Sequence, residues 1–180
     1  MTFKAQIMDE AGVRRALRRI SFEIAEKNRG VDNVVLVGIR RRGVSVAKEI
    51  RENILSSEGV SVPLGELDVT FYRDDVTKKS PAPAIGEVAV PFDVTDKTVV
   101  LTDDVIFTGR TVRAAIEAIF SLGRPRAIQF AALVDRGHRE LPIKADYVGK
   151  NVPTSMNEVV RVSFPEYDGT PIGVSLYSVN

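Results

Sequence analysis

The sequence predicts an α/β fold built around a mostly parallel sheet, with helices packed against it. Two observations carry this prediction. Short apolar runs rich in Val, Ile and Leu alternate with segments whose apolar residues recur at helical spacing. One run, Val34–Ile39, is continuous rather than alternating, which is typical of a strand buried on both faces. The chain has 180 residues, of which 44% are apolar, so we expect a single domain over residues 1–180.

The first half of the chain is predicted to form two helices and two strands. Asp9 is placed to cap a helix whose apolar residues recur at helical spacing and which we expect to end at Gly30. The buried strand Val34–Ile39 follows, and a second helix begins after Gly43. Residues 64–71 are the next predicted strand.

Residues 72–91 differ in character from the segments on either side. They contain three prolines and show no clear period. A long loop of this kind within a compact domain is either a lid that closes over a site or a disordered hairpin, and both interpretations stay open. We expect the loop to be flexible in either case.

The second half repeats the alternation of strand and helix. We expect a strand at residues 99–102, a helix at residues 108–122 that ends at Gly123, and a buried strand at residues 128–134. Two shorter segments, at residues 159–164 and 172–179, alternate more strongly. They are expected at an edge or flank of the sheet.

Composition excludes several classes of protein. The chain has no cysteine, which excludes disulfides, thiolate metal sites and a catalytic thiol, and its single histidine excludes a multi-histidine metal site. The net charge is +1, from 25 basic and 24 acidic residues, so any nucleic acid must be bound through a local patch. No signal peptide or membrane span is visible in the sequence, and we expect a cytoplasmic protein without membrane contact.

The strand at residues 99–102 leads directly into a motif suited to a sugar phosphate. Asp103 and Asp104 follow it at the edge of the sheet where α/β proteins bind ligands. The turn at residues 108–111 opens the next helix, so its backbone N–H groups suit a phosphate, and Gly109 allows close approach of the main chain. Carboxylates beside a phosphate fit a ligand that also presents hydroxyls, as a ribose does. Either half alone is equally typical of an ordinary capped helix.

This motif resembles the phosphoribosyl pyrophosphate (PRPP) motif of type I phosphoribosyltransferases. Residues 72–75, 123–125, 133–143 and 148–155 further resemble one bacterial subfamily, the bifunctional pyrimidine operon attenuators and uracil phosphoribosyltransferases. The resemblance runs from about residue 8 to residue 155. The residues of the motif itself are Val99, Val100, Leu101, Thr102, Asp103, Asp104, Val105, Ile106, Phe107, Thr108, Gly109, Arg110 and Thr111.

The resemblance implies the type I phosphoribosyltransferase fold, in which a flexible hood loop accompanies the central sheet. It also implies a glycosyltransferase that moves ribose 5-phosphate from PRPP to uracil, giving uridine monophosphate (UMP) and pyrophosphate. Asp103 and Asp104 would hold the ribose hydroxyls, and residues 108–111 the 5′-phosphate. Mg²⁺ would be bound mainly by the oxygens of PRPP, with no protein metal site.

A run of three arginines follows the strand Val34–Ile39. In the family it would face pyrophosphate, where cations stabilise the charge that develops in the transition state. Without the resemblance, a solvated basic turn is the simpler interpretation. The run, called the arginine turn below, is Arg40, Arg41 and Arg42, and we expect Arg41 and Arg42 to be catalytic together with the two aspartates.

The base and the hood are the remaining parts of the implied active site. Uracil would contact main-chain groups around Val134, Asp135 and Arg136. His138 is a candidate catalytic base, although an oriented hydrogen bond or an RNA contact is the favoured role. The residues expected to close over PRPP and exclude water are Tyr72, Arg73, Asp74 and Asp75.

The second implied activity is regulation of transcription termination, by uridine-nucleotide-dependent (UMP or UTP) binding to the leader mRNA of a pyrimidine operon. Four arginines spread over about 140° of the first helix, opposite its apolar residues. A solvated arginine face is the simpler interpretation, but the near-neutral total means that positive charge is concentrated here. The predicted RNA-binding residues are Arg14, Arg15, Arg18, Arg19, His138, Arg139 and Lys144.

Several positions depart from the subfamily pattern. Thr102 replaces the usual valine, the arginine turn is more basic than the common Lys-Thr, and Arg18 and Phe22 stand where other members often have Thr and His. The competing interpretation is a purine (hypoxanthine or guanine) phosphoribosyltransferase without an RNA-binding role, because the PRPP motif does not name the base. Residues 135–139 favour uracil. The family further implies a homo-oligomer.

Overall fold

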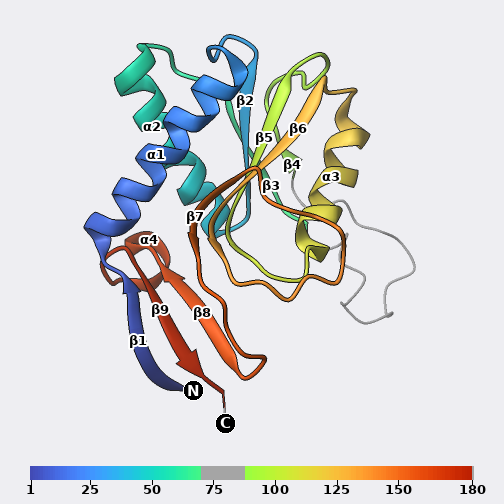
Figure 1. Ribbon diagram of the computed structural model, residues 1–180. Helices are drawn as coiled ribbons and strands as arrows, with labels where there is room; N and C mark the ends of the chain where they lie inside the picture. The colour runs from blue at the N-terminus through green and yellow to red at the C-terminus, as the bar shows by residue number, and fades with distance from the viewer. Residues whose placement is uncertain (70–87, 180) are drawn as a thin grey trace.

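The computed structural model describes residues 1–69 and 88–179, which form two sheets (Figure 1). Five strands of the central sheet are parallel, and a short sixth strand at one edge is antiparallel. The predicted α/β fold with a mostly parallel sheet is confirmed. The order across the sheet is β4 (Val88–Ala89), β3 (Leu64–Leu67), β2 (Val34–Ile39), β5 (Thr98–Ile106), β6 (Ala127–Asp135) and β7 (Tyr147–Asn151).

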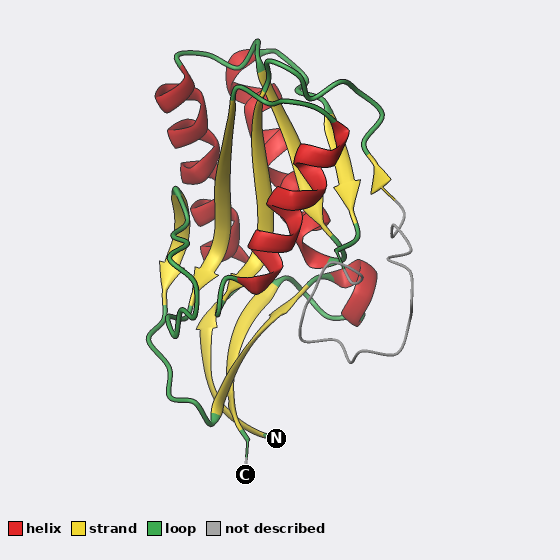
Figure 2. Ribbon diagram, turned by 90° about the vertical axis from the view of Figure 1, so that its right-hand side faces the viewer, coloured by secondary structure: helices red, strands yellow, loops and turns green. Residues whose placement is uncertain are grey.

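Helices cover both faces of the central sheet (Figure 2). α1 (Glu10–Asn28) and α2 (Arg42–Glu58) pack on one face, and α3 (Arg110–Leu122) packs on the other. The sequence of strand β2 is continuously apolar because both of its faces are covered by helices. Leu36 belongs to the core under α1 and α2, whereas its neighbours Val35 and Val37 belong to the core under α3.

The second sheet is antiparallel and lies below the central sheet in Figure 1. Its order is β1 (Thr2–Met8), β9 (Gly173–Ser178) and β8 (Glu158–Ser163), and the short helix α4 (Pro165–Asp168) lies between β8 and β9 in sequence. The segments expected at an edge or flank of the central sheet therefore pair with each other and with β1. The sequence analysis missed β1, because most of its side chains are exposed and no buried face marks the strand.

Several predicted boundaries are corrected by the structure. The last residue of α1 is Asn28, and the residue that caps the helix in the left-handed region is Arg29 (φ 56°), not the expected Gly30. The N–H of Gly30 donates to the Ala25 carbonyl at 2.9 Å. The strand predicted at residues 64–71 ends at Leu67. Besides β1, two further strands were not predicted, the short β4 and the edge strand β7. The predicted hood residues 72–75 lie outside the described residues.

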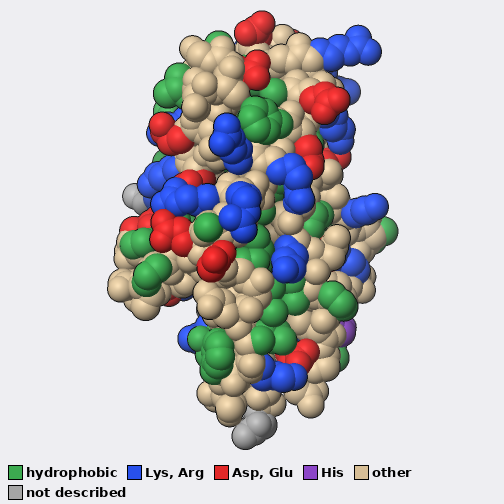
Figure 3. Space-filling model, turned by 60° about the vertical axis from the view of Figure 1, so that its left-hand side comes forward, with side chains coloured by type: hydrophobic (Ala, Val, Ile, Leu, Met, Phe, Trp, Pro, Cys, Tyr) green, Lys and Arg blue, Asp and Glu red, His purple; other side chains and the backbone are tan. Residues whose placement is uncertain are grey.

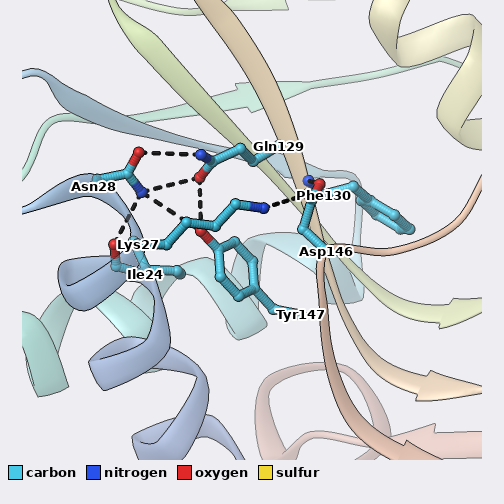
Figure 4. Close-up of polar contacts among 7 residues, drawn as sticks. All are labelled: Ile24, Lys27, Asn28, Gln129, Phe130, Asp146 and Tyr147. Carbon is cyan, nitrogen blue, oxygen red and sulfur yellow. Dashed lines mark hydrogen bonds and ion pairs between the residues drawn. The ribbon is translucent and has the colours of Figure 1, made fainter.

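A polar network fixes the end of α1 against β6 and β7 (Figure 4). The side-chain amides of Asn28 and Gln129 donate to each other at 3.0 Å, and the Tyr147 hydroxyl donates to Gln129 Oε1 at 2.7 Å. Lys27 pairs with Asp146 at 2.6 Å. Burial raises the pKa of Tyr147 to about 12, so the hydroxyl stays a donor at neutral pH. These contacts hold α1 in place relative to the sheet.

Candidate functional site

The carboxyl ends of three parallel strands bring the predicted site residues to one edge of the central sheet. Gly38 of β2 pairs with Thr102 of β5, and Val105 of β5 pairs with Val134 of β6. The arginine turn, the carboxylate pair and residues 134–136 follow these positions directly. A parallel sheet therefore places them side by side, at the edge that faces the second sheet.

Asp103 and Asp104 end the buried part of β5. Each carboxylate accepts the backbone N–H of the next residue at 2.9 Å. Asp104 also lines a cleft of about 820 Å³ that is formed mainly by β8, β9 and the starts of α1 and α2. Burial raises the pKa of Asp104, while hydrogen bonds and the charge of Arg42 act in the opposite direction. The motif residues Val99, Val100 and Leu101 are fully buried, so they support the aspartates from within the core.

Thr102 joins the carboxylate strand to the start of α2. Its buried hydroxyl donates to the Gly43 carbonyl at 2.7 Å. A Cβ added at Gly43 would lie 2.4 Å from the Thr102 carbonyl oxygen, which no side chain tolerates. The close approach of these two backbones sets the position of the arginine turn, which immediately precedes Gly43.

The turn at residues 108–111 that is predicted to bind phosphate, called the phosphate turn below, lies at the start of α3. Gly109 lies in the left-handed region (φ 94°) and precedes α3, which begins at Arg110. The loop after β6 packs against this turn. Backbone N–H groups of Glu140 and Leu141 donate to the Thr108 carbonyl, and the Glu140 carboxylate pairs with Arg110 at 2.6 Å. The turn is therefore held from outside as well as by its own helix.

Arg139, predicted to contact RNA, points into the protein. Its guanidinium donates to the carbonyls of Phe107 and Ile143 at 2.8 and 2.9 Å and pairs with Asp135, and only 22% of the side chain is exposed. These contacts tie the end of β6 to the phosphate turn. Its RNA contact stays a prediction, and of the same predicted set Lys144 is exposed in the loop before β7.

The residues expected around the base form a packed group at the end of β6. Arg136 is 7% exposed, lies 4.1 Å above the Phe107 ring, and donates to the Glu158 carbonyl at 2.7 Å. Burial lowers its pKa. The His138 Nε2 atom lies 2.6 Å from the Thr154 carbonyl oxygen, and the rings of His138 and Phe107 pack in a T-shaped arrangement. Thr154 was missed by the sequence analysis, although it lies in the segment 148–155 that resembled the subfamily.

The arginine turn lies between β3 and the second sheet. Arg40 pairs with Glu66 at 3.3 Å, and the peptide bond between Arg40 and Arg41 is cis. Arg42 pairs with Asp168 at 2.6 Å and lines the same cleft as Asp104. The hydrogen bond to Asp168 raises the pKa of Arg42, so the guanidinium is charged at every physiological pH.

The arginines of α1 point in different directions. Arg14 pairs with both Glu10 and Glu49 at 2.9 Å, and Arg18 lies 5.7 Å from the ring of the exposed Phe22. Arg15 and Arg19 instead line an open groove of about 680 Å³ between α1, β1 and β7. Arg19 also pairs with Glu23 at 3.3 Å. On the predicted arginine face, Arg14 is therefore neutralised by two carboxylates and Arg19 by one, whereas Arg15 lines the groove and is open to a ligand.

Lys150 of β7 lines the same groove and was missed by the sequence analysis, because one lysine in a short strand carries no pattern. We call Arg15, Arg19 and Lys150 the basic groove. Arg19 also donates to the carbonyls of Val148 and Gly149 at 2.8 and 2.7 Å, which holds α1 against β7. Lys and Arg side chains gather on the face of the molecule that Figure 3 shows.

The described residues also limit what else the chain holds. Within residues 1–69 and 88–179, no helix combines the length and the apolar character that crossing a membrane requires. In the same ranges, no three His, Asp or Glu side chains gather into a group that could hold a metal ion.

Comparisons with known proteins agree with this geometry. A family model described as a phosphoribosyl transferase domain matches residues 5–167, which defines the chain as a phosphoribosyltransferase. The bifunctional protein PyrR of Caldicellulosiruptor saccharolyticus is 63% identical, over 91% of this chain and 90% of its own length. That of Clostridioides difficile is 57% identical, over 94% and 96%. The chain belongs to the PyrR family of bifunctional proteins, as the resemblance predicted.

Solved structures show the same fold at low sequence identity. The hypoxanthine phosphoribosyltransferase of Trypanosoma cruzi superposes with a TM-score of 0.75 at 18% identity, covering 99% of this chain and 96% of its own. A hypoxanthine-guanine phosphoribosyltransferase of Bacillus anthracis gives a TM-score of 0.71 at 18% identity and covers both chains fully. The predicted type I phosphoribosyltransferase fold is confirmed.

Proposed function

We propose that this protein makes UMP from uracil and PRPP, and that it also regulates attenuation of a pyrimidine operon by binding leader mRNA. The observation that carries the enzymatic part is the convergence of the aspartate pair, the phosphate turn and the arginine turn at one edge of the sheet. The purine alternative is not favoured. Relatives named PyrR share 53–63% identity with the chain, whereas the purine enzymes of similar fold share only 16–19%.

In the proposed reaction, the carboxylates of Asp103 and Asp104 accept hydrogen bonds from the ribose hydroxyls. Their charge also favours the oxocarbenium-like sugar that forms as the bond to pyrophosphate breaks. The phosphate turn at residues 108–111 binds the 5′-phosphate through backbone N–H groups at the start of α3. Together these contacts fix both ends of the ribose phosphate while its anomeric carbon reacts.

Arg41 and Arg42 are proposed to receive the pyrophosphate that leaves. The negative charge on this group increases as the glycosidic carbon separates from it, so guanidinium groups at this position stabilise the transition state more than the ground state. Arg42 lines the cleft together with Asp104, which places a cation and a ribose-binding carboxylate around the same space.

The site residues fit a magnesium ion that arrives with PRPP. Mg²⁺ prefers oxygen ligands and is usually held by one or two carboxylates together with substrate phosphates. Asp103 and Asp104 offer such oxygens, and PRPP would supply the others. The bound ion would neutralise charge on the pyrophosphate group.

Uracil is proposed to lie at the end of β6, against main-chain groups of Val134, Asp135 and Arg136. The Arg136 side chain is anchored by Phe107, Thr154 and the Glu158 carbonyl. Its backbone N–H donates to the Ile106 carbonyl at 3.2 Å, so the main chain is held as well. A base read by a rigid main chain is selected through its own donors and acceptors.

RNA is proposed to bind across α1, with the basic groove as its centre. Phosphates contribute affinity without sequence preference, and Arg15, Arg19 and Lys150 line an open surface where they can meet them. Lys144, His138 and Arg139 remain the predicted extension toward the loop after β6. Cytoplasmic location follows from both proposed roles.

One set of assays tests the proposal. The protein is incubated with PRPP, Mg²⁺ and either uracil, hypoxanthine, guanine or orotate, and nucleotide formation is measured. We expect uracil to be the only one of the four bases that gives a nucleotide, which is UMP. A gel shift with pyrimidine-operon leader RNA, with and without UMP, tests the second activity, and an unrelated RNA of the same length is the control. Product from a purine base, or equal binding of both RNAs, would contradict the corresponding half of the proposal.

A further inference from the structure

Three consecutive side chains of helix α4 contact the arginine turn and the first residues of α2. Glu166 accepts a hydrogen bond from the hydroxyl of Ser45, which is 2% exposed. The Tyr167 hydroxyl donates to the Arg41 carbonyl at 3.2 Å. Asp168 pairs with Arg42 Nη2 at 2.6 Å. A segment of four residues therefore contacts the turn and the first residues of α2, which lie more than 120 residues away in sequence.

The same segment is firmly anchored to the protein. Phe164, just before α4, is 1% exposed and belongs to the core under α1 and α2. Asp168 uses both carboxylate oxygens, one to accept the Phe164 N–H at 2.9 Å and the other to pair with Arg42. The contact between α4 and the arginine turn is thus made by a residue that is itself fixed in place.

The charges agree with this geometry. Burial alone would raise the pKa of Asp168, but the hydrogen bonds from Arg42 and from the Phe164 backbone hold it below its ordinary value. The carboxylate is therefore ionised at neutral pH. It contacts one terminal nitrogen of Arg42, Nη2, which is compatible with simultaneous binding of a phosphate oxygen by the other terminal nitrogen.

We propose that Glu166, Tyr167 and Asp168 are positioning residues, which hold the arginine turn in the geometry that binds the diphosphate of PRPP and the pyrophosphate product. Asp168 orients the Arg42 guanidinium, Tyr167 fixes the Arg41 backbone, and Glu166 fixes the first turn of α2. Fixing long side chains before the ligand arrives removes an entropic cost from binding. This inference rests on the proposed pyrophosphate role of the arginine turn.

The alternative is that Asp168 competes with pyrophosphate for Arg42. The two possibilities predict opposite signs. If Asp168 orients Arg42, its removal weakens binding of pyrophosphate and PRPP. If it competes, its removal tightens their binding, because an anion that blocks the guanidinium has gone.

The experiment compares Asp168→Ala, Asp168→Asn and Tyr167→Phe with the parent protein. We measure the dissociation constants of pyrophosphate and UMP by calorimetry and the KM for PRPP with uracil. For Asp168→Ala we expect the pyrophosphate constant and the PRPP KM to rise roughly tenfold, with UMP binding unchanged. Asp168→Asn keeps an oxygen to accept the Phe164 N–H, so α4 stays in place while the charge is removed, and Tyr167→Phe removes a single hydrogen bond. Both are expected to give smaller changes in the same direction.

Glu117→Ala is the matched control. It removes a carboxylate that also lies 2.6 Å from an arginine, Arg113, but on the exposed face of α3. We expect all three ligand constants to stay at the parent values in this variant. Tighter pyrophosphate binding in Asp168→Ala, or an equal loss for pyrophosphate and UMP, would overturn the proposal.

Arg42→Ala separates this inference from the proposed function. We expect it to weaken pyrophosphate and PRPP binding, and we expect Asp168→Ala to add nothing in that background, because the group that Asp168 orients is already missing. If Arg42→Ala has no effect, the pyrophosphate role of the turn fails and the inference fails with it. If Arg42→Ala weakens binding while Asp168→Ala does not, the positioning role alone is wrong.

Discussion

The edge of the central sheet and the basic groove both collect charged residues, but they do so in different ways. At the sheet edge, Asp104 is buried enough for its pKa to rise, and Arg40 and Arg42 are each paired with a carboxylate. In the groove, Arg15 and Lys150 lie on an open surface. The sheet edge is therefore preorganised for one small ligand, while the groove can contact the irregularly spaced phosphates of a folded RNA.

The largest expected effect tests the preorganised region. Asp103→Asn and Asp104→Asn each keep the shape of the side chain and remove its charge. We expect each variant to lose about 1.5–3 kcal/mol of transition-state stabilisation. This loss corresponds to a fall in kcat/KM for PRPP of roughly ten- to a hundredfold. Steady-state kinetics on folded variants measures this. Leader-RNA binding without nucleotide should be retained, and parent-like kinetics in both variants would refute the ribose assignment.

The next effect concerns the open region and its internal contrast. Arg15→Ala should weaken leader-RNA binding and reduce the steepness of log affinity against log salt by about one for each phosphate that the variant no longer binds. Arg19→Ala should act in the same direction but less strongly, because Glu23 lies 3.3 Å from that guanidinium. Arg14→Ala should change the slope less, because Glu10 and Glu49 already neutralise that guanidinium.

Titrations at several salt concentrations decide this prediction, and uracil transfer should survive in all three variants. If Arg14→Ala and Arg15→Ala lower the slope equally, the division of α1 into a neutralised and an open part has no meaning for RNA. If no variant changes binding, the RNA site lies elsewhere.

A smaller effect links the burial of Asp104 to the pH dependence of stability. Its pKa is raised in the folded protein, so the native state holds this proton more tightly than the unfolded chain does. The protonated carboxyl therefore stabilises the folded protein fully at a pH below the pKa that Asp104 has in the unfolded chain. This stabilisation disappears as the pH rises through the pKa that Asp104 has in the folded protein. Asp104→Asn does not titrate. We therefore expect its Tm relative to the parent to increase from about pH 4 to about pH 8, which thermal unfolding without ligand measures. A Tm difference that does not vary with pH would show that the pKa of Asp104 is not raised in the folded protein.

The smallest effect concerns the hydrogen bond that joins strand β5 to the start of helix α2. Thr102→Val restores the residue usual in the subfamily and removes the hydrogen bond to the Gly43 carbonyl. We expect the free energy of unfolding to fall by about 1 kcal/mol, or the Tm by roughly 2–4 °C, with little change in KM for PRPP. A large rise in KM would mean that the hydroxyl itself sets the position of the arginine turn.

The sequence predicted the part of the site that depends on local pattern. The strand before Asp103, the turn at Gly109 and the strand before Val134 all carry signals within a few residues, and parallel pairing then forces them together. The continuous apolar run Val34–Ile39 likewise predicted a buried strand, and the arginine turn follows the carboxyl end of that strand.

The parts that were missed depend on distant contacts. α4 is four residues long and receives its role from Arg41, Arg42 and Ser45, which no local period announces. β1 is largely exposed and is a strand only because β9 pairs with it. Arg139 lies in a basic segment of the sequence, yet its side chain points into the protein, because the carbonyls of Phe107 and Ile143 accept hydrogen bonds from its guanidinium.

The second sheet also determines the order in which the protein can be completed. Strand β1 pairs with β9, so that Thr2 lies opposite Ser178 (Figure 1). On the ribosome, β1 must therefore remain without its partner while the whole of the central sheet is synthesised. Residues of α4 emerge shortly before β9. The arginine turn, made early, thus waits for contacts made late, and a chain released prematurely would hold a formed ribose-phosphate site beside an unsupported diphosphate site.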